Sequence, residues 1–287
     1  WCRPVNALDL HNMKHLMRVY PDGHRISSSN FDPLVYWRRG VQMAALNWQT
    51  YDLGMQINHA MFEGGTDSSG YVLKPTALRD IQVLPYNEDI ASGKKERHVV
   101  SFSINVMSAQ QLMKPADWPA GKDMNPYIEV EIIDGRLPPG KQKEHDLEPV
   151  NDADSPLKGC TEIIRQNGWM PRYNKGQFHF KVTTKHPELL FVKWTVKLSP
   201  NGESFNNKGH GIASYMAKLV NLRQGFHTLP LVNGDGAQYL FSTLFCHFKL
   251  DSIEKHLIDG PRRAAGHVEC PDHRHVAKGR HQRPDAR

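Results

Sequence analysis

The amino-acid sequence predicts an α/β segment followed by an all-β domain that folds as an antiparallel β-sandwich. Two observations predict this order. Within residues 1–85, short apolar runs alternate with helix-like segments, which is typical of parallel α/β folds. Within residues 98–250, apolar and polar residues alternate with a period of two, which is typical of strands with one buried face. The chain has 287 residues, which is long enough for both parts.

The α/β segment reads as a strand–helix–strand unit. Residues 15–20 form a short apolar run that stops at a proline, which predicts a strand. A helix should begin near Asp32, because Asp is a favourable N-cap and a proline follows it. Residues 41–46 are almost continuously apolar, as expected of a strand that is buried on both faces. A further short helix is expected at residues 55–62.

A polar stretch at residues 86–97 is predicted to be a linker between the two parts. The strands of the sandwich that follows are expected at residues 100–106, 128–132, 178–182, 192–198, 229–231 and 244–250. Residues 140–158 read as a charged loop. Residues 251–287 are predicted to be a basic, disordered tail, because apolar residues become scarce there.

Composition bounds the class of protein. No apolar run approaches the ~20 residues of a transmembrane helix. The four cysteines show no CxxC spacing, so we expect a reducing compartment and no disulfide framework. The chain opens at Trp1 with no visible secretory leader, and we expect it to be part of something longer. Residues 261–287 carry seven Lys or Arg against three Asp or Glu, so a surplus of four of the net charge of +6 lies there. This stretch is expected to be solvated, and contact with anionic lipid or nucleic acid is the weaker alternative.

Several motifs then occur in the order found in a known family. They are Arg18-Val-Tyr-Pro21, Ser28-Ser-Asn-Phe31, Ala45-Leu-Asn-Trp-Gln-Thr50 and Gly70-Tyr-Val-Leu-Lys-Pro75. This segment resembles the end of the Y half of eukaryotic phosphoinositide-specific phospholipase C, and its residues are similar to those of fungal members of that family. The later motifs Asn125-Pro-Tyr-Ile128, Asn167-Gly-Trp169 and Ser242-Thr-Leu-Phe245 are more loosely similar to the C2 domain that follows it in that family.

The resemblance implies an enzyme that hydrolyses phosphatidylinositol 4,5-bisphosphate to inositol 1,4,5-trisphosphate and diacylglycerol. Such enzymes use a (β/α)8 barrel made of an X half and a Y half, with two catalytic histidines and a Ca²⁺ ion held in the X half. This chain matches only about the last two barrel strands, so residues 1–85 are expected to be an incomplete TIM barrel. Two strands cannot close a barrel, and apolar faces should stay exposed. No catalytic residue is expected in this chain, which should be inactive alone.

The resemblance implies two substrate-binding residues, Arg18 and Tyr20. A guanidinium suits a ring phosphate because its fork pairs bidentately with phosphate oxygens, and an aromatic face can cover the inositol ring. The polar residues that close the second strand are Asn47, Gln49 and Thr50, and hydrogen bonds at the barrel rim explain them better than ligand contact. Trp37 and Trp48 are expected to be packing residues, and Lys74 to be structural or solvated.

The histidines of the Y-like segment match neither catalytic histidine of the family and are expected to be ordinary surface or loop residues; they are His11, His15, His24 and His59. A late cluster could suggest zinc, but its spacing fits no familiar module and we expect no site there; it comprises His267, Cys270, His273 and His275.

The C2-like part is expected to bind no Ca²⁺, which needs several carboxylate oxygens. Amides stand at Asn125 and Asn174 where C2 domains that bind Ca²⁺ carry aspartates, and only Asp123 and Glu203 remain nearby. The sequence therefore predicts no metal site in this chain.

Two functions remain open at this stage. The first is the C-terminal part of a phospholipase C that works with an upstream X half on phosphoinositide headgroups. The alternative is a non-catalytic C2 module that binds membranes or partners. Both place the protein in the cytoplasm, peripheral at anionic membranes. Nucleic-acid binding is not expected, because no stacking aromatics interrupt the basic tail.

Overall fold

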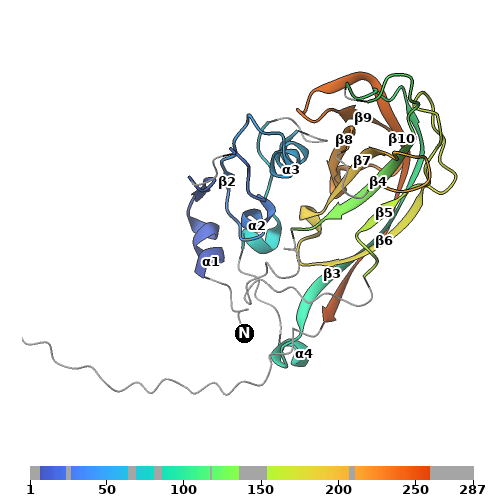
Figure 1. Cartoon of the computed structure of the whole chain (residues 1–287). Helices are drawn as coiled ribbons and strands as arrows, with labels where there is room; N and C mark the ends of the chain where they lie inside the picture. The colour runs from blue at the N-terminus through green and yellow to red at the C-terminus, as the bar shows by residue number, and fades with distance from the viewer. Residues whose placement is uncertain are drawn as a thin grey trace, which may run out of the picture.

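The structure is a computed structural model, and it describes residues 7–23, 27–63, 69–80, 86–116, 118–135, 154–206 and 211–258. Two parts lie side by side, a small α/β segment and a large sheet domain (Figure 1). Within the described ranges, no helix is long and apolar enough to span a membrane.

The α/β segment contains the strand–helix–strand unit that the sequence predicts. Its elements are α1 (Ala7–Lys14), β1 (Arg18–Val19), α2 (Leu34–Trp37), β2 (Met43–Ala44), α3 (Leu53–Phe62) and the 3₁₀ turn η1 (Thr76–Leu78). β1 and β2 pair in parallel, with Arg18 opposite Met43 and Val19 opposite Ala44. The strands are shorter than expected, because each has a single hydrogen-bonded neighbour in this sheet.

The first predicted helix also differs from its expected extent. The Asp32 carboxylate accepts the backbone N–H of Leu34. The N-cap is Pro33, not Asp32 as the sequence predicts, and α2 has only four residues. A stronger cap begins α3, where the side chain of Asp52 accepts the N–H of Met55.

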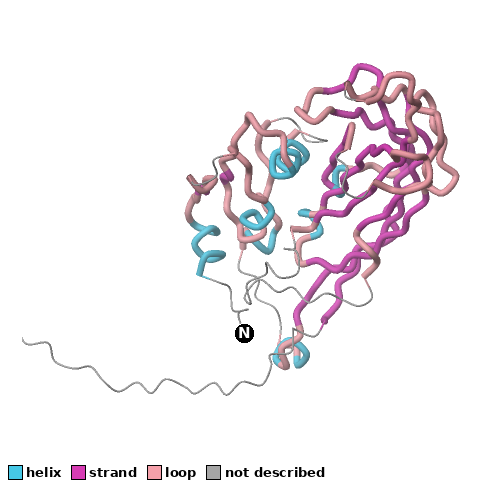
Figure 2. The backbone as a smooth tube through the Cα atoms, in the orientation of Figure 1, coloured by secondary structure: helices cyan, strands magenta, loops and turns pink. Residues whose placement is uncertain are grey.

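The large domain is an antiparallel β-sandwich. Its strands are β3 (Lys95–Gln110), β4 (Pro126–Ile133), β5 (Lys158–Cys160), β6 (Gln177–Thr184), β7 (Phe191–Leu198), β8 (Ala213–Lys218), β9 (Gly225–Val232) and β10 (Gln238–Ile258). Hydrogen bonds connect these strands, magenta in Figure 2, in one order that divides into two four-stranded groups, β5-β4-β7-β8 and β9-β10-β3-β6. β8 and β9 join them at a single pair, Ser214 with Val232. The antiparallel β-sandwich that the sequence predicts for this part of the chain is therefore confirmed.

The core lies between the two groups and follows the predicted alternation. In β3 the side chains of Val100, Phe102 and Ile104 are buried, whereas Ser101 and Ser103 between them are not. Trp194 on β7 and Leu231 on β9 reach the same core from other strands. Each fully buried large apolar side chain stabilises the fold by about 1.5–3 kcal/mol.

The ends of two strands differ from the sequence expectation. β3 begins at Lys95, inside the expected linker, and β10 continues to Ile258, inside the expected tail. These extensions pair with each other, with Lys95 opposite Ile258. Much of this ribbon is exposed, so its residues show no apolar alternation that a sequence reading can detect. A short helix, α4 (Glu88–Ala91), also occupies the linker, capped by Asn87. The rest of the predicted tail lies outside the described residues.

An apolar cluster joins the two parts. Leu34 of α2 and Ile57 of α3 pack with Phe191 of β7 and with Leu189 in η2 (Pro187–Leu189). Trp37 belongs to the same cluster, so its expected packing role is confirmed. The α/β segment therefore rests on the outer face of the sandwich.

The same segment also exposes apolar side chains, as predicted, although its two-stranded sheet does not by itself show a barrel. Leu16 and Leu73 are largely exposed, and Met43 on β2 is partly so. Trp48 was expected to be a packing residue, and this is wrong. Its side chain is 66% exposed, because the loop after β2 lies at the rim of the segment, and it touches the ring of His59 only edge-on.

Candidate functional site

Arg18 and Tyr20 lie side by side where β1 ends. The guanidinium carbon of Arg18 stands over the ring of Tyr20, 5.0 Å from its centroid. Both side chains are exposed, whereas Val19 between them is half-buried. This is the consequence of period-two alternation, because residues two apart share a face of a strand. The structure thus brings the two predicted substrate-binding residues together.

This pair can bind a phosphorylated polyol. A guanidinium presents a planar fork of N–H donors that matches two phosphate oxygens. An aromatic ring covers an apolar face and keeps a hydroxyl for solvent or ligand.

The loops after β1 and β2 are tied together by the side chain of Asn30. Its Nδ2 donates to the carbonyl oxygens of Asn47 (3.2 Å) and Thr50 (3.1 Å), and to Oδ1 of Asp52 (3.1 Å). Its Oδ1 accepts the backbone N–H of Asn47 at 2.6 Å. Asn47 in turn donates to the carbonyl of Ser28. The two loops that follow the parallel strands therefore form one connected rim.

This network accounts for one of the polar side chains at the end of the second strand. The side chain of Asn47 makes a rim hydrogen bond to the carbonyl of Ser28, as expected. Thr50 takes part in the rim through its backbone carbonyl, and Gln49 is exposed. Sequence reasoning missed Asn30 as the centre of the network. The Ser-Ser-Asn-Phe motif was the available signal, but a motif does not reveal which loop its asparagine reaches.

The opposite end of the strands is closed by local contacts. Gln42 accepts the N–H of Met17 and donates to the carbonyl oxygens of Asn12 and His15. Lys74 donates to the carbonyl oxygens of Asn12 and Gly40, so its expected structural role is confirmed. Ligand groups in parallel α/β folds gather at the carboxyl ends of strands, which is the end of Arg18, Tyr20 and the Asn30 rim.

The described histidines of the α/β segment have partners other than Arg18 and Tyr20. His11 and His15 contact each other through their rings, and Nδ1 of His59 lies 2.7 Å from a carboxylate oxygen of Glu63. His24 lies outside the described residues, as does the late cluster of His267, Cys270, His273 and His275.

The loops of the sandwich engage their polar residues in internal bonds. Oδ1 of Asn125 accepts the N–H of Gln166, and its Nδ2 donates to the carbonyl of Ser199. Glu203 pairs with Arg165 at 3.0 Å. The part of the chain that the structure describes holds no group of three or more His, Cys, Asp or Glu side chains placed to share a metal ion.

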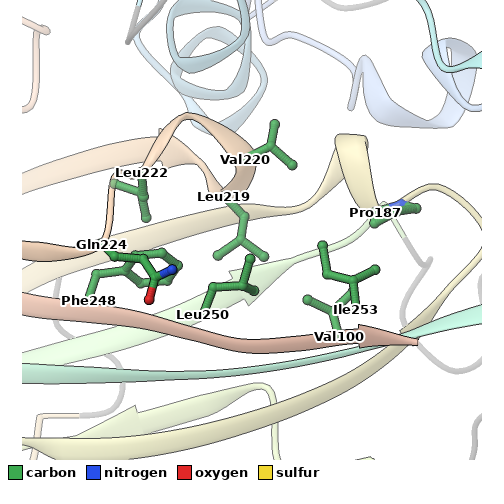
Figure 3. A pocket seen from close by; sticks show the side chains of 9 residues that line it. All are labelled: Val100, Pro187, Leu219, Val220, Leu222, Gln224, Phe248, Leu250 and Ile253. Carbon is green, nitrogen blue, oxygen red and sulfur yellow. The ribbon is translucent and has the colours of Figure 1, made fainter.

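The apolar cavity shown in Figure 3 is a separate feature. It has a volume of about 190 Å³ and lies between β3, β10 and the turn η3 (Leu219–Asn221). Val100, Leu219 and Phe248 line it, and Gln224 supplies a polar group. Such a lining does not fit a phosphorylated headgroup.

Comparison with known proteins supports the family resemblance. Residues 3–77 match the family model of the phosphatidylinositol-specific phospholipase C Y domain. The chain is 37% identical over 256 residues to 1-phosphatidylinositol 4,5-bisphosphate phosphodiesterase 1 of Candida albicans, covering 85% of this chain and 23% of that protein. It is 34% identical to the protein of the same name from Saccharomyces cerevisiae, covering 85% of this chain and 27% of that protein.

A solved structure agrees with these relatives. The crystal structure of L. pealei PLC21 matches with a TM-score of 0.57 and 27% identity, covering 88% of this chain and 27% of that one. The chain thus spans about a quarter of the length of the proteins it matches. It resembles the C-terminal region of the eukaryotic phosphoinositide-specific phospholipases C and carries their Y-domain sequence at residues 3–77.

Proposed function

We propose that this chain is the C-terminal part of a phosphoinositide phospholipase C. In the complete enzyme it helps to bind the headgroup of phosphatidylinositol 4,5-bisphosphate, which is hydrolysed to inositol 1,4,5-trisphosphate and diacylglycerol. The observation that carries the proposal is the Arg18–Tyr20 pair at the carboxyl end of β1, inside the segment that matches the Y domain.

In this proposal the two residues have distinct roles. Arg18 binds a ring phosphate through its guanidinium, and Tyr20 packs on the inositol ring. Asn30 holds the neighbouring rim in place through its bonds to Asn47 and Asp52. Acid–base chemistry belongs to the upstream X half, and so does the Ca²⁺ that the family uses. No step through Ca²⁺ is assigned to the residues described in this chain.

The domain organisation follows from the same proposal. Residues 1–85 are part of a barrel whose remaining strands come from upstream, 86–97 connect it to a C2-like sandwich at 98–250, and 251–287 form a basic tail. The observed strand ends extend the sandwich outward to Lys95 and Ile258. The open β1–β2 pair and the exposed Leu16 and Met43 are where further strands would pack. We place the complete protein in the cytoplasm, peripheral at anionic membranes.

The test begins with the mass of the native protein, measured in its own cells with an antibody against the tail. A mass of about twice 32.7 kDa or more supports a complete enzyme. Arg18→Gln in that polypeptide should then lower kcat/KM for phosphatidylinositol 4,5-bisphosphate by about 10²-fold or more, since it removes a charge-assisted bidentate contact. Hydrolysis of unphosphorylated phosphatidylinositol should change much less. Arg223→Gln, an exposed arginine of the sandwich, is the matched control. Equal loss on both lipids would contradict the assigned role.

A non-catalytic binding module is the second candidate. It is favoured by one observation: the sandwich has its own complete core, whereas β1 and β2 are only a two-stranded sheet. A native mass near 32.7 kDa would make it the leading function.

A further inference from the structure

Two serines of the chain are followed directly by proline, and their environments in the structure differ. They are Ser155 and Ser199. Ser199 is fully buried, and its hydroxyl donates to the carbonyl of Ser204 at 2.7 Å. Ser155 is only half-buried, and its hydroxyl donates weakly to the carbonyl of Lys181, at 3.5 Å. An enzyme that recognises a Ser-Pro pair in the folded chain can therefore reach Ser155 but not Ser199.

The residues that follow Ser155 suit recognition by a kinase. A residue before proline favours an extended backbone, and the proline has no N–H for which an enzyme pocket must provide an acceptor. Lys158 is 49% exposed, although its Nζ also contacts a carboxylate oxygen of Glu129 at 3.0 Å. Kinases select substrates partly by charges near the hydroxyl, and a cation three residues after the serine can pair with a carboxylate on the enzyme. The corresponding position after Ser199 is Gly202, which has no side chain.

Residues 154–157, which we call the edge bridge, connect two strands that belong to different four-stranded groups. Toward β6, the N–H of Ser155 donates to the carbonyl of Lys181 at 3.0 Å. Oγ of Ser155 in turn accepts the N–H of Lys181 at 2.8 Å. Toward β4, the carbonyl of Leu157 accepts the N–H of Ile132 at 2.7 Å. The oxygen that a kinase would modify is therefore one of the atoms that hold the edge bridge on β6.

We infer that Ser155 is a phosphorylation site for a proline-directed serine kinase, and that the phosphate releases the edge bridge from β6. In this reaction Oγ of Ser155 forms a bond to the γ-phosphorus of ATP, and the bond between that phosphorus and the oxygen that bridges it to the β-phosphorus breaks. ADP leaves, and the hydroxyl proton passes to a carboxylate base of the kinase. The inference does not depend on the proposed function, because it concerns the sandwich alone.

The phosphate acts on the edge bridge through its size and its charge. It is attached to the oxygen that accepts the N–H of Lys181, so the phosphoryl group crowds this hydrogen bond. It also adds a charge of about −1.5 to −2 at pH 7. That charge lies next to the carboxylate of Asp154, whose Oδ1 accepts the hydroxyl of Thr183 at 2.6 Å. Repulsion between the two anions weakens this second contact with β6, so both effects favour release.

The first experiment incubates the folded full chain with a purified kinase of the cyclin-dependent class, ATP and Mg²⁺, and maps the product by mass spectrometry. We expect phosphorylation of Ser155, none of Ser199, and none of the Ser155→Ala variant. Pro156→Ala and Lys158→Ala should each lower kcat/KM for the transfer at least about tenfold. Lys175→Ala, which removes an exposed lysine just before β6, is the matched control and should change the rate little.

Amide hydrogen exchange then measures the release of the edge bridge. In the phosphorylated chain the N–H groups of Ser155 and Lys181 should exchange at least about tenfold faster, because local opening becomes more favourable. The N–H of Val196, buried in β7, should be unaffected. Ser155→Ala separates loss of the hydroxyl from the effect of the phosphate. It removes the acceptor of the Lys181 N–H but leaves the N–H at position 155 bonded, so only the Lys181 amide should exchange faster.

Three results would overturn the inference. The first is no transfer to the folded chain; a synthetic peptide of residues 152–160 then shows whether the motif or the fold prevents it. The second is transfer to Ser199 at the same rate as to Ser155, which would show that the kinase acts on unfolded chains. The third is phosphorylation of Ser155 that leaves the exchange of both amides unchanged, which would contradict the release.

Discussion

The rim centred on Asn30 gives a sharp prediction for Asn30→Ala. The substitution removes the hydrogen bonds that Nδ2 donates to the carbonyl oxygens of Asn47 and Thr50 and to Oδ1 of Asp52. It also removes the hydrogen bond that Oδ1 accepts from the backbone N–H of Asn47. Net hydrogen bonds contribute about 0.5–1.5 kcal/mol each. These are part-buried, so we expect the free energy of local opening of this rim to fall by roughly 2–4 kcal/mol.

Amide hydrogen exchange measures this opening directly. The N–H of Asn47 should exchange at least about tenfold faster in Asn30→Ala, because each 1.4 kcal/mol corresponds to a factor of ten. The amide of Ile104, in the sandwich core, should be unaffected. Asn105→Ala is the matched control, since it truncates an asparagine on β3 away from the rim. Unchanged exchange at Asn47 would refute the view that Asn30 holds the two loops together.

Three further predictions concern the fold and the metal question. Burial lowers the pKa of His186 to about 2, so at acidic pH the unfolded chain binds a proton that the native chain excludes. The free energy of unfolding should therefore fall by up to about 1.4 kcal/mol for each pH unit below pH 6.5. Urea titrations of His186→Gln should show a shallower dependence of this free energy on pH. Gly135→Ala should destabilise the protein more than Gly93→Ala in thermal unfolding, because both glycines have positive φ but only a Cβ at 135 would meet Leu34, at 2.8 Å. Calorimetry of the full chain should show no micromolar Ca²⁺ binding, and a micromolar site would contradict the sequence prediction.

Much of the sandwich was predictable because its signal is local. The alternation from Val100 to Val106 indicates which face of β3 is buried, whatever strand lies beside it. The end of β10 was not predictable in this way. Its residues beyond Leu250 pair with a segment about 150 positions earlier in the chain, as in Ile253 with Val100, and backbone pairing leaves no side-chain pattern when the ribbon is exposed.

The candidate site likewise combines features that the local sequence predicts with features that depend on distant contacts. The sequence by itself determined that Arg18 and Tyr20 share a face, because side chains two apart in a strand point the same way. Only the tertiary structure decided that Asn30 joins the loops after β1 and β2, that Trp48 is exposed, and that Gly236 packs on Tyr51. Alternation is a property of the local backbone, whereas these contacts depend on which segments distant in the sequence fold against each other. A single sequence does not show which distant segments are in contact.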